Sequence, residues 1–188
     1  MQNRTDVELI ELINSRNTNA LKELYSRYNL NVYNFVLRYT NNKIIAEDIL
    51  QETFTRVWFA SHTFNPIKGL VKTWIFTIAL NITRNEMSLK RYAYNYVDIE
   101  EITVDDPENL ENLRDNPINI LENLETKDRI SKALEKLNPF FKEVVLLKHF
   151  QELKFREISE MTNTPEGTLK ARFHKALIML RKILQEEK

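Results

Sequence analysis

The sequence predicts an all-α protein: two small helical domains joined by an acidic linker, the second containing a helix-turn-helix. Only two glycines, Gly69 and Gly167, and five prolines occur among its 188 residues. Sheets need many turns, and turns need glycine, proline, asparagine and aspartate, so this scarcity favours helices with short connections. Apolar residues also recur at intervals of three and four along most of the chain, which is typical of helices with one buried face.

The balanced total charge hides a strong asymmetry along the chain. Residues 1–95 hold 12 basic and 8 acidic side chains (net +4), residues 96–126 hold 1 and 10 (net −9), and residues 127–188 hold 14 and 9 (net +5). A polar segment with so much like charge does not bury a core. We therefore predict a linker over 96–126 between domains at 1–95 and 127–188. The basic blocks suit a polyanion such as nucleic acid, or are ordinary solvated helix surfaces.

The composition also excludes several kinds of site. There is no cysteine, so disulfides and thiolate metal sites are ruled out. The only histidines, His62, His149 and His174, fall in three different elements without the spacing of metal ligands. We expect no metal, no cofactor and no enzymatic activity. The start of the chain is polar and no apolar run approaches the length that spans a bilayer, so we expect a cytoplasmic protein.

The N-terminal block is predicted to form four helices. Asp6 is a candidate N-cap for the first of them. Pro66 and Gly69 predict a loop over 64–70. The other three helices follow from apolar stripes, over about 19–39, 44–60 and 71–91.

The fourth helix of this block is basic and has two distinct faces. Its predicted inward stripe is Val71, Trp74, Ile75, Ile78 and Ile82. Its predicted polar face is Thr73, Thr77, Asn81, Arg84, Ser88 and Arg91. Such a face can follow one nucleic-acid strand, and the nearby rings of Phe64, Trp74 and Phe76 can hold unstacked bases. The alternative is that these rings belong to the core, which the spacing favours for Trp74.

The C-terminal block is predicted to form helices over 127–136, 139–150, 155–161 and 165–186. Thr164 is a good N-cap for the last helix, with Pro165 in its first turn. The short helix, the polar turn and the long helix together have the layout of a helix-turn-helix. The alternative is a plain helical hairpin within a bundle.

The last helix presents a groove-reading face opposite its apolar stripe. The inward stripe is Leu169, Phe173, Ala176, Leu177 and Leu180. The opposite face is Gly167, Thr168, Ala171, His174, Lys175 and Ile178, flanked by Lys170 and Arg172. Thr168, Lys170 and Arg172 suit phosphates, whereas Ala171 and Lys175 suit base edges. Glu166 opposes DNA at this end unless it pairs with a neighbouring cation.

Three segments resemble the sigma-70 family of bacterial RNA polymerase sigma factors, in its extracytoplasmic-function (ECF) type. Glu47–Trp58 is similar to the helix that binds the polymerase core, and Thr73–Asn85 to the promoter-melting helix. Leu137–Arg181 resembles the family's second domain. Within it, Asn138, Lys154, Arg156 and Ala171 depart from the family's usual residues.

The resemblance implies roles for particular side chains. Core-polymerase binding would fall to Asp48, Gln51, Glu52, Arg56 and Trp58. Contacts with the minus-ten element would fall to Phe64, Lys68, Trp74, Thr77, Asn81 and Arg84. Contacts with the minus-thirty-five element would fall to Lys154, Arg156, Thr168, Lys170, Ala171, Arg172, His174 and Lys175.

The resemblance also implies partners. These are the clamp of the largest subunit of the polymerase core, promoter DNA and an anti-sigma factor, with the acidic linker in the RNA channel of the polymerase. The main alternative is a stand-alone helix-turn-helix regulator. That alternative accounts for 153–182 but leaves 47–58 without a role.

Overall fold

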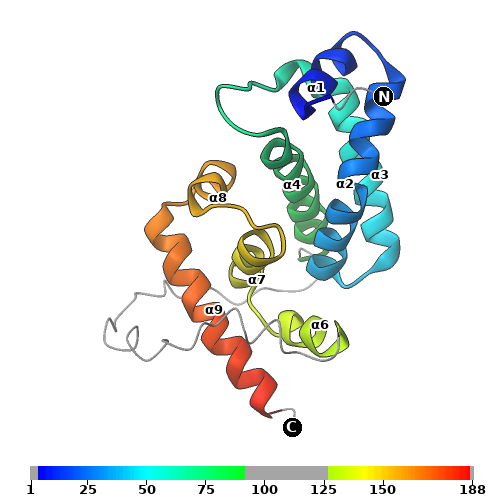
Figure 1. The fold of residues 1–188 in the computed structure, drawn as a ribbon. Coiled ribbons are helices and arrows are strands. Elements are labelled where there is room, and N and C mark those ends of the chain that lie inside the picture. The colour runs from blue at the N-terminus through cyan, green and yellow to red at the C-terminus, as the bar shows by residue number, and fades with distance from the viewer. Residues whose placement is uncertain (1–3, 92–126, 187–188) are drawn as a thin grey trace. The chain divides into compact units, whose positions relative to one another are not determined.

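The computed structural model describes residues 4–91 and 127–186 of the chain, and these ranges contain helices and no strand (Figure 1). The all-α prediction is confirmed there, and the predicted linker at 96–126 lies outside the described residues. The chain divides into two compact helical units.

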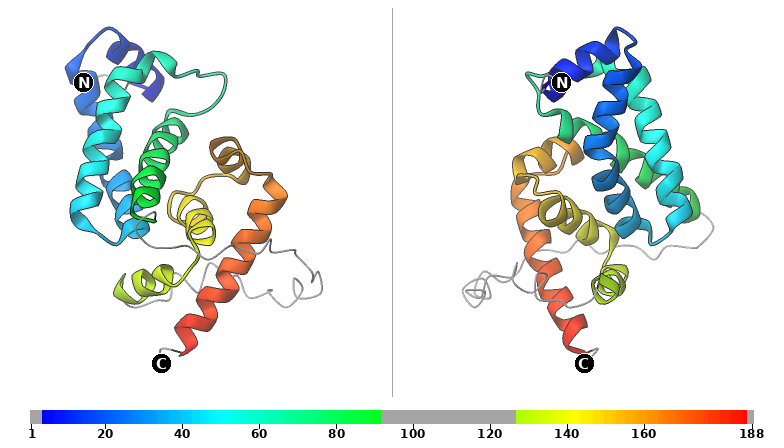
Figure 2. Two further views of the ribbon diagram at one scale, coloured as in Figure 1. Left: turned by 180° about the vertical axis from the view of Figure 1, so that it is seen from behind. Right: turned by 45° about the vertical axis from the view of Figure 1, so that its right-hand side comes forward.

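The first unit is built around two long antiparallel helices, α2 and α3, which lie side by side (Figures 1 and 2). Asparagine side chains cap both helices: Asn17 accepts from backbone N–H groups at the start of α2, and Asn42 does so for α3. The elements of the unit are α1 (Asp6–Asn14), α2 (Thr18–Thr40), α3 (Lys43–Ala60), η1 (Ser61–Thr63) and α4 (Val71–Arg91).

Helix α4 completes the core of this unit, with a buried face that differs from the predicted one. Phe76 is fully buried and meets Phe35 of α2 edge to face, with ring centroids 5.6 Å apart. The predicted stripe is therefore partly wrong, since Trp74 and Ile78 are only half-buried. The buried residues of α4 are Val71, Ile75, Phe76, Ala79, Leu80, Ile82 and Thr83. A second apolar row on the helix, outside the predicted stripe, lies in the core.

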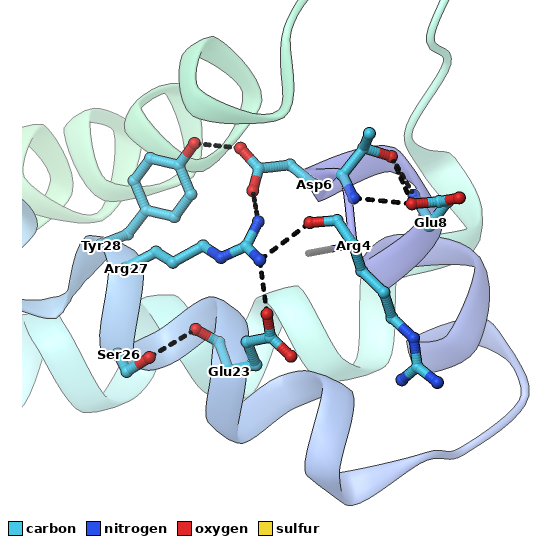
Figure 3. A network of polar contacts seen from close by, with 8 residues as sticks. Arg4, Asp6, Glu8, Glu23, Ser26, Arg27 and Tyr28 are labelled. Atoms are coloured by element: carbon cyan, nitrogen blue, oxygen red, sulfur yellow. Dashed lines mark hydrogen bonds and ion pairs between the residues drawn. The ribbon is translucent and has the colours of Figure 1, made fainter. Parts of the chain in front are cut away.

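The prediction that Asp6 caps α1 is wrong, because Thr5 is the cap. The Thr5 hydroxyl accepts from the Glu8 N–H at 3.3 Å, and the Glu8 carboxylate accepts from the Thr5 N–H at 2.6 Å. This reciprocal pair is a capping box. Asp6 instead accepts hydrogen bonds from Arg27 and Tyr28 of α2 (Figure 3). Its carboxylate thus fastens α1 to α2.

The described residues 127–186 form α6 (Lys127–Glu135), α7 (Pro139–Val145), η3 (Leu146–Phe150), α8 (Phe155–Thr162) and α9 (Glu166–Glu186). Helices α6 and α7 both pack on α9. All five residues of the predicted inward stripe of α9 are buried, so that prediction is confirmed. The Arg129 guanidinium donates to the Leu184 carbonyl at 3.2 Å and ties α6 to the end of α9.

The helix-turn-helix is formed by α8 and α9, with a tight turn at Asn163. Asn163 has a φ of 52°, a left-handed conformation that asparagine tolerates. Helix α8 begins where the Lys154 N–H donates to the Glu157 carboxylate at 2.6 Å. Helix α9 begins at Glu166, one residue later than expected, and the Pro165 carbonyl accepts from Leu169 at 3.1 Å.

Candidate protein-docking and nucleic-acid interfaces

An open groove of about 710 Å³ runs between α2 and α3 on the first unit. Phe54 lies at its base, 5% exposed, and meets Tyr25 edge to face with ring centroids 4.8 Å apart. Its rim is more exposed, at 39% for Tyr25 and 63% for Phe59. The lining residues are Thr18, Leu21, Lys22, Tyr25, Gln51, Phe54, Thr55, Trp58 and Phe59. A concave apolar surface of this kind suits an amphipathic helix of a partner protein.

The groove gathers some of the residues predicted to bind the polymerase core. Gln51 and Trp58 line it. Asp48, Glu52 and Arg56 are exposed on the same helix but are not part of the lining. Arg56 pairs with Glu52 at 2.7 Å, one turn apart. An exposed pair of this type contributes little to the stability of the fold. The two side chains can therefore separate and pair with a partner protein at little cost in stability.

Sequence reasoning missed the α2 side of the groove and one residue at its end. Leu21 and Tyr25 of α2 line the groove, although neither was predicted to have a role in binding. Arg16, between α1 and α2, places its guanidinium carbon 5.4 Å from the ring centre of Trp58 and 5.9 Å from that of Phe59. The feature of the sequence that could have indicated this surface is the adjacent aromatic pair, Trp58 and Phe59, near the end of α3.

The loop before α4 and the start of that helix form a second candidate surface. Phe64 and Trp74 are half-buried, with ring centroids 5.6 Å apart. Between them the loop is open to solvent: Ile67 is 94% exposed and Leu70 is 62% exposed, and Lys68 is also exposed. An exposed loop next to an aromatic pair and a lysine can receive an unstacked base.

The polar face of α4 is only partly available to a ligand. The Thr77 hydroxyl donates to the Thr73 carbonyl at 2.8 Å, so its proton is engaged within the helix. Asn81 is exposed and Arg84 is half-buried. Of Thr77, Asn81 and Arg84, the residues of this face that were predicted to contact the minus-ten element, only Asn81 is exposed.

Helix α9 carries the third candidate surface. Thr168, Lys170 and Lys175 are exposed, whereas Ala171, Arg172 and His174 are half-buried. The Nδ1 atom of His174 is buried and has no hydrogen-bond partner. Lys154 and Arg156, in the α8 part of the motif, are both exposed.

Two charged side chains near the start of α9 have close neighbours, one in an ion pair and one in a cation–π contact. Lys170 lies 3.9 Å from Glu166, so the acidic residue that opposed DNA binding has a neighbouring cation. The Arg172 guanidinium lies 5.0 Å from the ring centre of Phe140 in α7. Phe140 was not predicted to have a role, because the sequence alone does not show that it contacts Arg172.

Within the two described ranges, no three His, Asp or Glu side chains gather in a way that could hold a metal ion. In the same residues no helix is both long and apolar enough to cross a membrane.

A helix-turn-helix, a basic helix and an apolar docking groove occur in one chain, and this combination defines a DNA-binding protein that also docks on a protein partner. Two family models match the chain: Sigma-70 region 2 over residues 24–91 and Sigma-70 region 4 over residues 127–180, together about two thirds of its length. Most of the groove lining and α4 fall in the first match, and α8 with most of α9 falls in the second. The chain belongs to the ECF group of the sigma-70 family.

Similar proteins agree with this assignment. The chain is 29% identical to the ECF RNA polymerase sigma factor SigW of Bacillus subtilis, over 94% of this chain and 95% of that protein. It is 28% identical to SigM of the same organism, over 81% and 87%. Among solved structures, CnrH in complex with the cytosolic domain of CnrY has a TM-score of 0.70 at 20% identity, covering 97% of this chain and 99% of that one. RpoE of Bartonella quintana, in complex with the anti-sigma factor NepR, has a TM-score of 0.66 at 20% identity, covering 89% and 98%.

Proposed function

We propose that this sigma factor directs the RNA polymerase core to specific promoters and opens the DNA there, through domains at 1–95 and 127–188. The observation that carries the proposal is the presence of both kinds of surface in one chain. A docking groove lies between α2 and α3, and a helix-turn-helix ends in α9. A stand-alone regulator would need the second surface only, so the groove disfavours that alternative.

The groove is the proposed site for the clamp of the largest polymerase subunit. The family resemblance implies that a coiled coil of the clamp occupies it, and a groove of this kind accepts the apolar face of a helix. Gln51 and Trp58 would contact it from the lining, and Asp48, Glu52 and Arg56 from the exposed face of α3. Large aromatic residues such as Trp58 commonly dominate the binding energy of an interface.

Strand opening is assigned to the loop 64–70 and to α4. Unstacking one base costs a few kcal/mol, and a protein pocket that receives the base can offset this cost. Phe64 and Trp74 supply aromatic surface beside the loop, and Lys68 supplies a cation for the backbone. Thr77, Asn81 and Arg84 would then follow the non-template strand along the helix. Binding energy would thus open the duplex, and nucleotide chemistry would remain with the polymerase, so the chain is not itself an enzyme.

Recognition of the minus-thirty-five element is assigned to α9 in the major groove. Thr168, Lys170 and Arg172 would hold phosphates, which fix the register of the helix. Ala171, His174 and Lys175 would face base edges. Lys154 and Arg156 would add phosphate contacts from the α8 side of the motif.

An anti-sigma factor is a further proposed partner, and the cytoplasm is the proposed compartment. The solved complex of RpoE with NepR supports the first, since a relative with the same fold binds such a protein. The second follows from the partners, because the polymerase and promoter DNA are found there.

Run-off transcription with core polymerase and a library of random promoters tests the proposed function. The expected result is initiation from sequences that share two fixed blocks at a fixed spacing. Omission of the chain must abolish those transcripts. Initiation that does not depend on the chain, or recovered sequences with a single block, would contradict the proposal.

A further inference from the structure

Arg16 has a backbone conformation that its own side chain disfavours. Its φ is 62°, in the left-handed region. The Arg16 N–H donates to the Ile13 carbonyl at 2.9 Å, and the Asn17 N–H donates to the Leu12 carbonyl at 3.0 Å. These two bonds form a Schellman motif, in which the left-handed position usually holds glycine because a Cβ atom is crowded there. The end of α1 would therefore be more relaxed with glycine in place of Arg16.

The side chain of Arg16 extends to the end of the docking groove. Its guanidinium carbon lies 5.4 Å from the ring centre of Trp58 and 5.9 Å from that of Phe59. One guanidinium nitrogen also donates to the Trp58 carbonyl at 3.4 Å. Both rings line the groove. A planar guanidinium can stack on rings while it donates hydrogen bonds at its edge, which a lysine cannot do in the same way.

We propose that Arg16 is a positioning residue of the docking groove: it holds the rings of Trp58 and Phe59 in the orientation that receives the polymerase core. This inference rests on the proposed function, since that function assigns the groove to the polymerase. Phe59 is 63% exposed. An exposed side chain that becomes ordered only on binding loses conformational entropy at that step, which lowers the affinity. Arg16 orders the rings in advance.

The strained backbone supports a functional role over a purely structural one. A side chain kept in a sparsely populated conformation points to a role that offsets the strain. Asn41, Asn163 and Glu152 are the other residues with positive φ in the two described ranges. Asparagine tolerates this conformation, which leaves Glu152 as the only comparable case there. Replacing Arg16 with glycine relieves the backbone strain, which favours stability. The same change removes the contacts with the two rings, which weakens binding of the polymerase core.

The experiment compares the full-length wild-type chain with Arg16→Gly. We expect the affinity for purified core polymerase to fall about threefold to tenfold, from the lost cation–π contacts and the loss of ring order. The melting temperature is expected not to fall by more than about 2 °C, since the relaxed backbone offsets the lost contacts. The indole N–H signal of Trp58 in a ¹⁵N NMR spectrum, assigned with Trp58→Phe, is expected to shift.

Glu152→Gly is the matched control. It makes the same backbone change at a φ of 57° in the second unit, far along the chain from the groove. Its core affinity should equal that of the wild type. The proposal is overturned if Arg16→Gly binds core as tightly as the wild type, or if it loses affinity together with more than about 2 °C of melting temperature. A wild-type chain that fails to bind core would overturn the proposed function itself, before any substitution is compared.

Discussion

The guanidinium of Arg172 lies 5.0 Å from the ring centre of Phe140, so an aromatic side chain of α7 holds a residue of α9 that is proposed to contact DNA. Phe140 is 42% exposed, so part of its ring lies at the surface beside the guanidinium. A guanidinium that stacks by its face keeps its N–H edge for a phosphate. The contact therefore orders a long, flexible side chain before the promoter arrives.

Replacing Phe140 with alanine tests this ordering. We expect binding of the polymerase holoenzyme to a minus-thirty-five duplex to weaken about twofold to fivefold, which is the size of an exposed cation–π contact. The slope of affinity against salt should stay unchanged, because no phosphate contact is removed. Arg172→Ala is the comparison, and its slope should fall by about one. Equal affinity for Phe140→Ala and the wild type, by fluorescence anisotropy, would count against the ordering.

The Glu166–Lys170 pair at the start of α9 leads to a gain-of-affinity prediction. The two side chains lie 3.9 Å apart and are both exposed, so their pairing contributes at most about 1 kcal/mol to folding. Glu166→Gln removes an anion next to DNA and frees Lys170 for a phosphate. We expect about threefold tighter binding to the minus-thirty-five duplex at low salt, with the gain disappearing as salt rises. Glu160→Gln, at an exposed position in α8, is the control for a change of net charge alone. A variant that binds no better than this control would show that Glu166 does not oppose DNA.

Tyr28 gives the first unit a defined response to alkaline pH. Burial, followed by its hydrogen bond to Asp6, raises the pKa of the Tyr28 phenol above its usual value (Figure 3). The folded state thus prefers the neutral phenol. This contribution is fully present below the unfolded pKa of about 10 and is lost as the pH rises above it.

Tyr28→Phe isolates that contribution. At pH 7 the variant should lose about 1 kcal/mol of unfolding free energy with the hydrogen bond. Above pH 10 the gap to the wild type should shrink, because only the wild type loses stability through this phenol. Urea unfolding followed by tryptophan fluorescence reports on the correct unit, since Trp58 and Trp74 both belong to it. A gap that stays constant up to pH 11 would contradict this account.

The helical layout was largely predictable from the sequence, because amphipathic stripes report which face of a helix is buried. The stripe of α9 from Leu169 to Leu180 is an example, and all of its members are buried. Helix α4 was harder, since it buries a wider face that includes Phe76 as well as Ile75. Pattern alone does not distinguish one buried row from two.

The candidate sites were less predictable, because they depend on contacts between residues far apart in the chain. Asp6 was expected to cap its own helix, but Arg27 and Tyr28, some twenty residues away, bind its carboxylate. Arg16 lies 42 residues before Trp58, and only the folded chain brings the two together. In each case a contact with a residue far away in the sequence, which local patterns do not reveal, determines where the side chain lies.

Equilibrium titration of purified core polymerase with this chain and with Trp58→Ala tests the central claim most directly. The account predicts tight binding by the wild type and a loss of at least about tenfold for Trp58→Ala, as for an aromatic residue that anchors an interface. Ile44→Ala is the matched control: Ile44 lies on the same helix, is 72% exposed and is not part of the groove lining, so this variant should bind normally. No binding by the wild type, or equal binding by Trp58→Ala, would contradict the account.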